Sequence, residues 1–331
     1  MIRCGLTIPN FTYPGVAPDE LFERVAAIAT TAESSGFDTV MVMDHFYQLP
    51  GNGPPEHEML EAYTLLGAIA ALTTTVNVGT LVTGVTYRNP AILAKTVTTL
   101  DVISKGRAFL GIGAAWYQLE HEALGVVYPP ITERFERLHD AVRICRAMFR
   151  GERPTIAGQH YHTVDAINSP APIRDGGPPI LIGGAGERKS LRLVAEYADV
   201  ANMPTTLAEL PRKLEALASH CADVGRDIAT ITKTGLGQLV LGRTHEEAVA
   251  KRDARLAAVG MPWGSLDDAT RAAVTNRMFV GDADEVGEQI GAFLAAGLDG
   301  MCFNLAGQEH DLEAIAFAGE VVTTATKAAG K

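Results

Sequence analysis

Cysteine is scarce in this chain, and no pair has the spacing of a metal-binding knuckle. The four cysteines are Cys4, Cys145, Cys221 and Cys302, with no Cys-x-x-Cys motif. Neither a zinc knuckle nor a disulfide framework is therefore indicated, and a reducing cytoplasm is the expected location. The opening RCGLTI segment lacks the basic and apolar regions of a signal peptide, and no run of 18 apolar residues occurs. We therefore expect neither export nor a membrane span.

Positive charge is also in the minority. The 28 Lys and Arg residues stand against 39 Asp and Glu residues, which gives a net charge of −11. Nucleic acid binding needs a basic face, so a small molecule is the expected partner and a nucleic acid is not. The sequence also contains no G-x-S-x-G elbow, P-loop or kinase signature.

Short apolar segments alternate with segments of helical periodicity along the chain. Strands are predicted at 4–8, 39–43, 76–82, 108–112, 179–184, 199–203, 229–241 and 300–305. Helices are predicted at 21–35, 91–103, 187–197, 207–225, 244–259, 283–296 and 312–324. Eight strand-helix units in 331 residues fit an α/β fold of the closed (β/α)8 barrel type better than an open doubly wound sheet.

The whole chain, 1–331, is predicted to form one barrel domain with two insertions. Residues 151–178 hold short alternating segments among Gly and Pro, and we predict a hairpin inserted over the barrel. Residues 260–278 form a second excursion, which we interpret as a lid.

Two titratable residues, Asp44 and His45, end the second predicted strand. Residues at the carboxyl ends of barrel strands face the active mouth, and histidine readily donates or accepts a proton near neutral pH. We therefore predict that His45 and Asp44 are catalytic. In the alternative, Asp44 caps the next turn and His45 only packs.

The segment after the fourth predicted strand, GIGAAWYQLEHEALG, reaches the same mouth. Trp116 either covers a planar ring or fills the rim, because aromatic side chains serve both purposes. Glu120 and His121 are expected on a helix surface or in a dimer contact rather than as a catalytic pair. His160 and His162 share a predicted strand face, but without a third ligand we predict no metal.

A glycine-rich turn, GGAGERKS, follows the strand predicted at 179–184 and opens a helix. Free N–H groups and the helix dipole at such a place can hold a phosphate. The spacing is not that of the G-x-G-x-x-G fingerprint, and the alternative is that the glycines only make a tight turn.

Several of these segments together resemble the luciferase-like flavin oxidoreductase superfamily. They are FDTVMVMDHF, VGTLVTGVTYRNPAILAKTVTTLDVISKGRAFLGIGAAW, ERFERL and PPILIGGAGERKSLRLVAEYAD. The Asp44-His45 pair and the SKGR-x-x-L-GIG-AAW tract are most similar to the branch that uses the deazaflavin coenzyme F420. The resemblance implies a (β/α)8 barrel with insertions, a homodimer, and a cofactor ring in the mouth.

The resemblance also assigns individual residues. It implies that His45 lies beside the reactive carbon of the ring with Asp44 next to it, and that a bulge near Leu81, Val82 and Thr83 lies behind the ring, with a non-prolyl cis peptide. Further cofactor contacts are implied for Ala114, Ala115, Gly183, Gly184, Ala185 and Gly186, the last four being the phosphate turn. From its position at the mouth we also predict that Trp116 contacts the cofactor.

The implied chemistry is hydride transfer between F420 and a small carbonyl, alcohol or activated alkene. Sugar-phosphate dehydrogenases of the branch carry a catalytic Glu where this chain places Trp116, which argues against a sugar phosphate. The alternatives are an FMN-dependent monooxygenase on the same barrel and a deazaflavin-binding protein without turnover. A barrel hydrolase has least support, because no paired carboxylates or metal ligands are evident.

Overall fold

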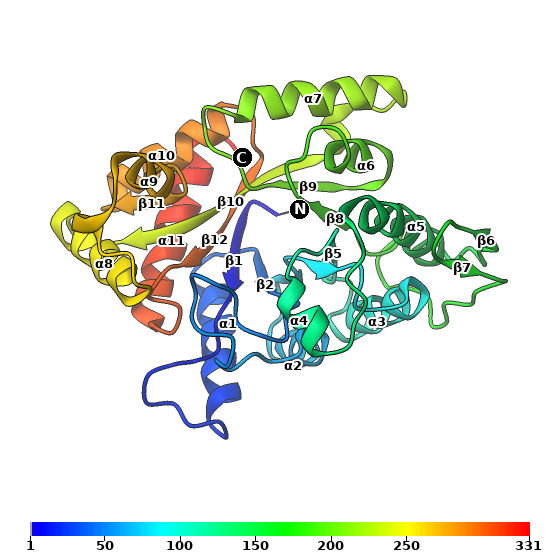
Figure 1. The fold of residues 1–331 in the computed structure, drawn as a ribbon, viewed down its shortest axis with the longest axis horizontal. Helices are drawn as coiled ribbons and strands as arrows, with labels where there is room; N and C mark the ends of the chain where they lie inside the picture. The colour runs from blue at the N-terminus through cyan, green and yellow to red at the C-terminus, as the bar shows by residue number, and fades with distance from the viewer. Residues whose placement is uncertain (1) are drawn as a thin grey trace.

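The chain folds into a barrel of parallel strands surrounded by helices (Figure 1), as the computed structural model, which describes residues 2–331, shows. The barrel strands are β1 (Cys4–Ile8), β2 (Thr39–Val42), β3 (Asn77–Thr80), β4 (Thr83–Gly84), β5 (Leu110–Gly113), β8 (Ile180–Gly183), β9 (Val200–Met203), β10 (Thr232–Leu241) and β12 (Gly300–Leu305). They pair in the order β3-β2-β1-β12-β10-β9-β8-β5-β4, and a bridge between Val78 and Ala108 joins β3 to the β5 segment. The predicted (β/α)8 barrel is confirmed.

The helices cover the outside of the barrel. They are α1 (Leu21–Ser34), α2 (Ala62–Leu72), α3 (Pro90–Ile103), α4 (Gln118–Ala123), α5 (Ile131–Phe149), α6 (Ser190–Tyr197), α7 (Leu210–Asp223), α8 (His245–Ala258), α9 (Asp268–Thr275), α10 (Ala283–Ala295) and α11 (Leu312–Ala328). Capping side chains explain where several helices begin. At the start of α3 the Asn89 side chain accepts from the N–H groups of Ala91 and Ile92, and Asp282 begins α10 with a capping box. No helix within residues 2–331 is both long and apolar enough to cross a bilayer.

The third predicted strand, 76–82, is shorter in the structure, where β3 ends at Thr80 and a second strand, β4, begins at Thr83. The peptide bond between Leu81 and Val82 is cis, and it separates β3 from β4. The cis peptide thus falls where the resemblance led us to expect one.

The segment predicted as an excursion at 260–278 contains α9 and leads into a strand that periodicity did not predict, β11 (Met278–Gly281). This strand pairs in parallel with Gln238–Leu241 of β10, outside the closed barrel. The Trp263 ring holds the segment against α8, because the Arg252 guanidinium lies 3.8 Å from its centroid.

The inserted segment 151–178 forms a hairpin, β6 (Ile156–Ala157) with antiparallel β7 (His162–Thr163). It packs beside α5 at the outer edge of the molecule rather than over the barrel mouth (Figure 1). His160 lies in the turn and contacts Glu136 of α5 at 2.8 Å, while His162 is exposed in β7. The prediction that these histidines share a strand face is wrong, because the strands are only two residues long.

A small cluster inside the barrel supports the floor of the mouth. It consists of Ile2, Met41, Phe109, Leu181, Val200 and Cys302, all buried, and Leu81, Val82 and Leu236 pack on it. Gly79 allows this packing, since a Cβ there would lie 2.6 Å from the Phe109 carbonyl oxygen. The floor of the mouth is therefore apolar and made of closely packed side chains.

Candidate active site

A cavity of about 470 Å³ opens at the carboxyl ends of the barrel strands, a volume within the range of small-molecule sites. Every residue predicted to touch the cofactor lines it, apart from Asp44: His45, Leu81, Val82, Thr83, Ala114, Ala115, Trp116, Gly183, Gly184, Ala185 and Gly186. The strand ends thus bring together segments that lie about 140 residues apart in the chain, as expected for a parallel barrel.

His45 lies at the wall of this cavity, and its ring is fixed from behind. Its Nδ1 is 2.8 Å from Oε1 of Glu120, and the edge of the Trp116 ring approaches with a centroid distance of 5.8 Å. An ionised carboxylate only accepts hydrogen bonds, so Nδ1 of His45 donates the proton. Within residues 2–331, Nε2 of His45 makes no hydrogen bond. The nitrogen that remains for a ligand is therefore Nε2.

The prediction for Glu120, a helix surface or a dimer contact, is wrong. Its side chain is completely buried. Besides His45, it accepts from the backbone N–H groups of Phe46 and Tyr47 at 3.0 and 3.2 Å, and from the Tyr87 hydroxyl. Burial acts to raise the pKa of Glu120, but these donors outweigh it, and the pKa lies below its ordinary value. Glu120 is thus a buried anion that orients His45.

His121 is buried as well, and here too the expected surface position is wrong. Its Nδ1 contacts the Tyr117 carbonyl oxygen at 2.7 Å and its Nε2 contacts Oγ1 of Thr86 at 2.7 Å. A helix-surface position was expected for Glu120 and His121. Instead α4, which follows β5, turns both side chains toward the barrel.

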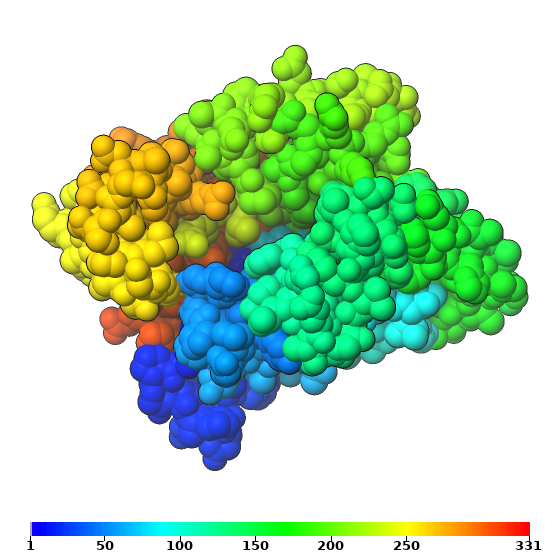
Figure 2. Space-filling model, viewed as in Figure 1, coloured from blue at the N-terminus to red at the C-terminus, as the bar shows by residue number. Residues whose placement is uncertain are grey.

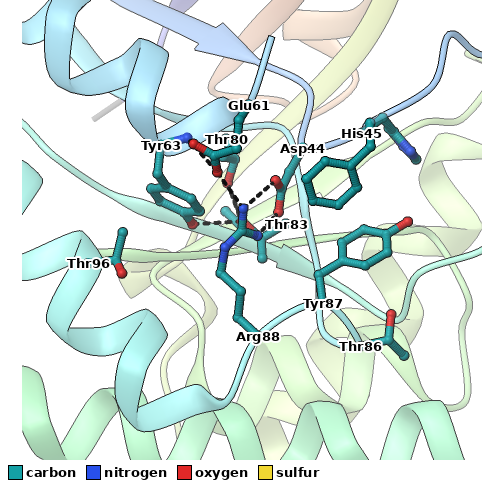
Figure 3. A network of polar contacts seen from close by, with 12 residues as sticks. Asp44, His45, Glu61, Tyr63, Thr80, Thr83, Thr86, Tyr87, Arg88 and Thr96 are labelled. Carbon is teal, nitrogen blue, oxygen red and sulfur yellow. Dashed lines mark hydrogen bonds and ion pairs between the residues drawn. The ribbon is translucent and has the colours of Figure 1, made fainter. Parts of the chain in front are cut away.

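Asp44 lies behind the cavity in an ion-pair network (Figure 3). The Arg88 guanidinium donates to both of its oxygens, at 2.5 and 3.0 Å, and also to Glu61 at 2.6 Å. Asp44 is 1% exposed, and burial raises its pKa against the opposing effect of Arg88. The guanidinium carbon of Arg88 lies 4.8 Å from the Tyr63 ring centroid, so the Tyr63 ring packs against this ion pair. Asp44 therefore holds the segment that carries His45, and it does not line the cavity.

The bulge after β3 is held by threonine hydroxyls. Oγ1 of Thr83 is 2.7 Å from the Tyr63 hydroxyl and 2.9 Å from Oγ1 of Thr80, which donates to the Gly111 carbonyl at 2.8 Å. These contacts fix Leu81 and Val82 at the cavity floor. The family resemblance implied the bulge but not the role of Tyr63, which lies in α2, 20 residues before Thr83.

The glycine turn closes the opposite side of the cavity. A Cβ on Gly183 would lie 2.9 Å from Val82, and one on Gly186 would lie 3.1 Å from Oγ of Ser190. Gly184 has φ of +129°, which only glycine adopts readily. The following helix α6 has no side-chain cap at Lys189, while the N–H groups of Gly184 and Leu191 donate to the carbonyl oxygens of Asn202 and Gly186. The turn therefore forms a narrow glycine wall at the start of α6.

The tract after β5 supplies the remaining wall. Ala115 has φ of +58°, which turns Trp116 to the rim, where its side chain is 55% exposed beside His45. The buried Arg134 donates to the Ala115 carbonyl and holds this turn. Among residues 2–331, no three His, Cys, Asp or Glu side chains form a group suited to a metal ion.

A parallel barrel with an apolar floor, a fixed histidine and a glycine turn at one mouth has the architecture of a barrel enzyme with a small-molecule site. The chain belongs to the luciferase-like monooxygenase family, whose model matches residues 2–300.

Individual relatives agree with this assignment. A protein of Segniliparus rotundus described as F420-dependent glucose-6-phosphate dehydrogenase is 31% identical over 319 residues, covering 88% of this chain and 90% of the relative. A solved F420-dependent secondary alcohol dehydrogenase in complex with an F420-acetone adduct superposes with a TM-score of 0.76 at 21% identity, over 96% of this chain and 99% of the other. The monooxygenase RslO1 of Streptomyces bottropensis gives 0.80 at 19% identity over all of both chains. These structural likenesses show the shared fold.

Proposed function

We propose that this protein is a coenzyme F420-dependent oxidoreductase that transfers a hydride between the deazaflavin and a small organic molecule. The observation that carries the proposal is the cavity itself. It joins His45, the bulge at Leu81 and Val82, and the glycine turn in one space. Relatives over most of the chain length are described as F420-dependent dehydrogenases.

The residues fit the cofactor in two respects. The apolar floor of Leu81, Val82 and Leu236 suits a flat ring system, and the Gly183–Gly186 turn at the start of α6 suits a phosphate. The bound coenzyme supplies a two-electron hydride donor or acceptor.

The protein supplies orientation and a proton site. Nε2 of His45 takes the hydroxyl proton when an alcohol is oxidised and returns it when a carbonyl is reduced. Glu120 holds the tautomer in which Nε2 has its lone pair free, and it stabilises the imidazolium that forms. Asp44 does not line the cavity and acts through His45. Its pairing with Arg88 fixes the backbone next to His45.

Cofactor titration tests the proposal. The purified apo-protein is titrated separately with coenzyme F420 and with FMN, and cofactor fluorescence gives both dissociation constants. We expect F420 to bind at least ~100-fold more tightly, about 2.7 kcal/mol. A preference for FMN assigns the protein to oxygen-using chemistry instead, and binding of neither contradicts the cofactor assignment.

A small-molecule substrate, a homodimer and a cytoplasmic location complete the proposal. The outer face of α3 supports the dimer, because its apolar residues Ile92, Val102 and Ile103 are 64%, 37% and 43% exposed. Sedimentation of the purified protein at micromolar concentration should give twice the chain mass, and a single-chain mass would contradict it. The four free cysteines are all buried, which is compatible with a reducing compartment.

A further inference from the structure

We infer that the substrate is an uncharged, mainly apolar alcohol, or the corresponding ketone or aldehyde, and not a sugar phosphate. This inference rests on the proposed F420-dependent function and narrows its substrate class. It is carried by the composition of the cavity wall and by the positions of the nearest cations.

The wall contains no charged side chain from Lys, Arg, Asp or Glu among the residues that the structure describes. Its larger apolar side chains, in addition to the floor, are Met43, Leu49, Trp116, Ile131 and Phe135. The polar side chains besides His45 are all uncharged: Thr83, Tyr87, Ser190 and Asn202. Away from the glycine turn, a phosphate dianion placed against such a wall would lose its water without gaining a charged partner, which is strongly unfavourable. A hydroxyl or carbonyl group needs only one hydrogen bond, and Nε2 of His45 can make it.

Two arginines beside the cavity wall are engaged elsewhere, and the exposed Arg188 lines a neighbouring groove rather than the cavity. Arg88 is paired with Asp44 and Glu61 behind the wall. Arg134 donates to the Ala115 carbonyl and lies 4.4 Å from the Tyr128 ring centroid.

Lys189 lies over the outside of Phe135, with its Nζ 5.3 Å from the ring centroid, and it lines a neighbouring groove. Arg255 and Arg277 line a separate hollow of about 250 Å³. Arg255 also donates to the Gly51 carbonyl at 2.6 Å. The glycine turn is the remaining anion cradle, and the proposed function assigns it to the cofactor.

The residues at the rim of the cavity also favour an apolar substrate. Trp116 and Ile131 both line the cavity and are 55% and 51% exposed. Covering such apolar surface with an apolar ligand is favourable by about 25 cal/mol per Å². The entrance therefore favours molecules with hydrocarbon bodies over sugars.

The reaction balances with these groups. The carbinol C–H bond breaks and its electron pair leaves with the hydrogen as hydride to oxidised F420. The hydroxyl proton passes to Nε2 of His45 and the C=O double bond forms. The reverse direction uses reduced F420 and an imidazolium to give the alcohol.

The test begins with enzyme saturated with F420, with binding followed by fluorescence. Calorimetric titrations then use cyclohexanol, cyclohexanone, glucose and glucose 6-phosphate, and turnover of F420 is measured with each. We expect saturable binding of the cyclohexyl compounds with a negative heat-capacity change, and turnover with them alone.

Ile131→Ser should weaken cyclohexanone binding by about tenfold, because three of the four side-chain carbons are lost from the wall and a hydroxyl is added. Ile167→Ser is the matched control. Ile167 is 62% exposed in the inserted segment and lies outside the cavity lining and the outer face of α3, so the cyclohexanone binding constant should stay unchanged.

The outcomes separate the two proposals. Failure to bind F420 overturns the proposed function. Normal F420 binding with binding or turnover of glucose 6-phosphate overturns the substrate inference alone. So does the absence of saturable binding by either cyclohexyl compound.

Discussion

Replacing the buried Glu120 by glutamine changes one hydrogen-bonding group at the centre of the site. Its Oε2 accepts two backbone N–H groups, from Phe46 and Tyr47, while its Oε1 accepts from Nδ1 of His45 and from the Tyr87 hydroxyl. In Glu120→Gln the single amide oxygen must face the two backbone donors, because these cannot reverse. The amide NH₂ then faces Nδ1.

The consequence is a change of tautomer at His45. Nδ1 must accept from the amide, so the proton moves to Nε2, which then has no lone pair for the substrate proton. General base catalysis contributes roughly 10²–10⁴-fold. We therefore expect Glu120→Gln to lower kcat by about 10³-fold, or about 4 kcal/mol. The affinity for F420 should change by less than about threefold, since Glu120 does not line the cavity.

Three measurements check this reasoning. Kinetics give kcat, fluorescence titration gives the cofactor affinity, and ¹⁵N NMR of the histidines identifies which ring nitrogen carries the proton. Glu122→Gln is the control, because Glu122 lies on the same helix but is exposed and bonds only to the Gln118 side chain. A Glu120→Gln enzyme with normal kcat, or with Nδ1 still protonated in the neutral ring, would refute the positioning role.

Three further predictions concern the same network. His45→Ala should lose about 10²–10⁴-fold in turnover while F420 binding is retained, and unchanged turnover would remove its catalytic role. Arg88→Ala should lower the free energy of unfolding by about 3–5 kcal/mol, because it leaves Asp44 buried and unpaired. Arg153→Ala, which breaks an exposed ion pair, should lower the free energy of unfolding by less than about 1 kcal/mol. Equal urea midpoints for Arg88→Ala and Arg153→Ala would contradict the expected difference between a buried and an exposed ion pair. Because the pKa of Glu120 is lowered on folding, its stabilisation is complete above its unfolded pKa of about 4.3 and is lost as pH falls further. The unfolding free-energy difference between wild type and Glu120→Gln should therefore shrink below about pH 4, and a difference that stays constant would oppose it.

The sequence determined the architecture and the location of the site. Apolar segments of strand length alternate with amphipathic helices, and parallel strands joined in this way bring their carboxyl ends to one face. The bulge at Leu81 and Val82 was expected from the family resemblance alone, whereas local rules sufficed to place His45 and the glycine turn at a single cavity. These features depend on neighbours in the chain, and periodicity and turn chemistry report such neighbours directly.

Tertiary structure decided which side chains face each other across the barrel. Glu120 follows a surface-like helical spacing, yet it is buried against a histidine 75 residues earlier. Asp44 is next to His45 in sequence, but successive residues turn to different sides, and its partner Arg88 lies 44 residues away. Pairing of this kind depends on the register of neighbouring strands and the path of their loops. Those are set by packing of the whole core, so the proton-handling network emerges only when the barrel closes.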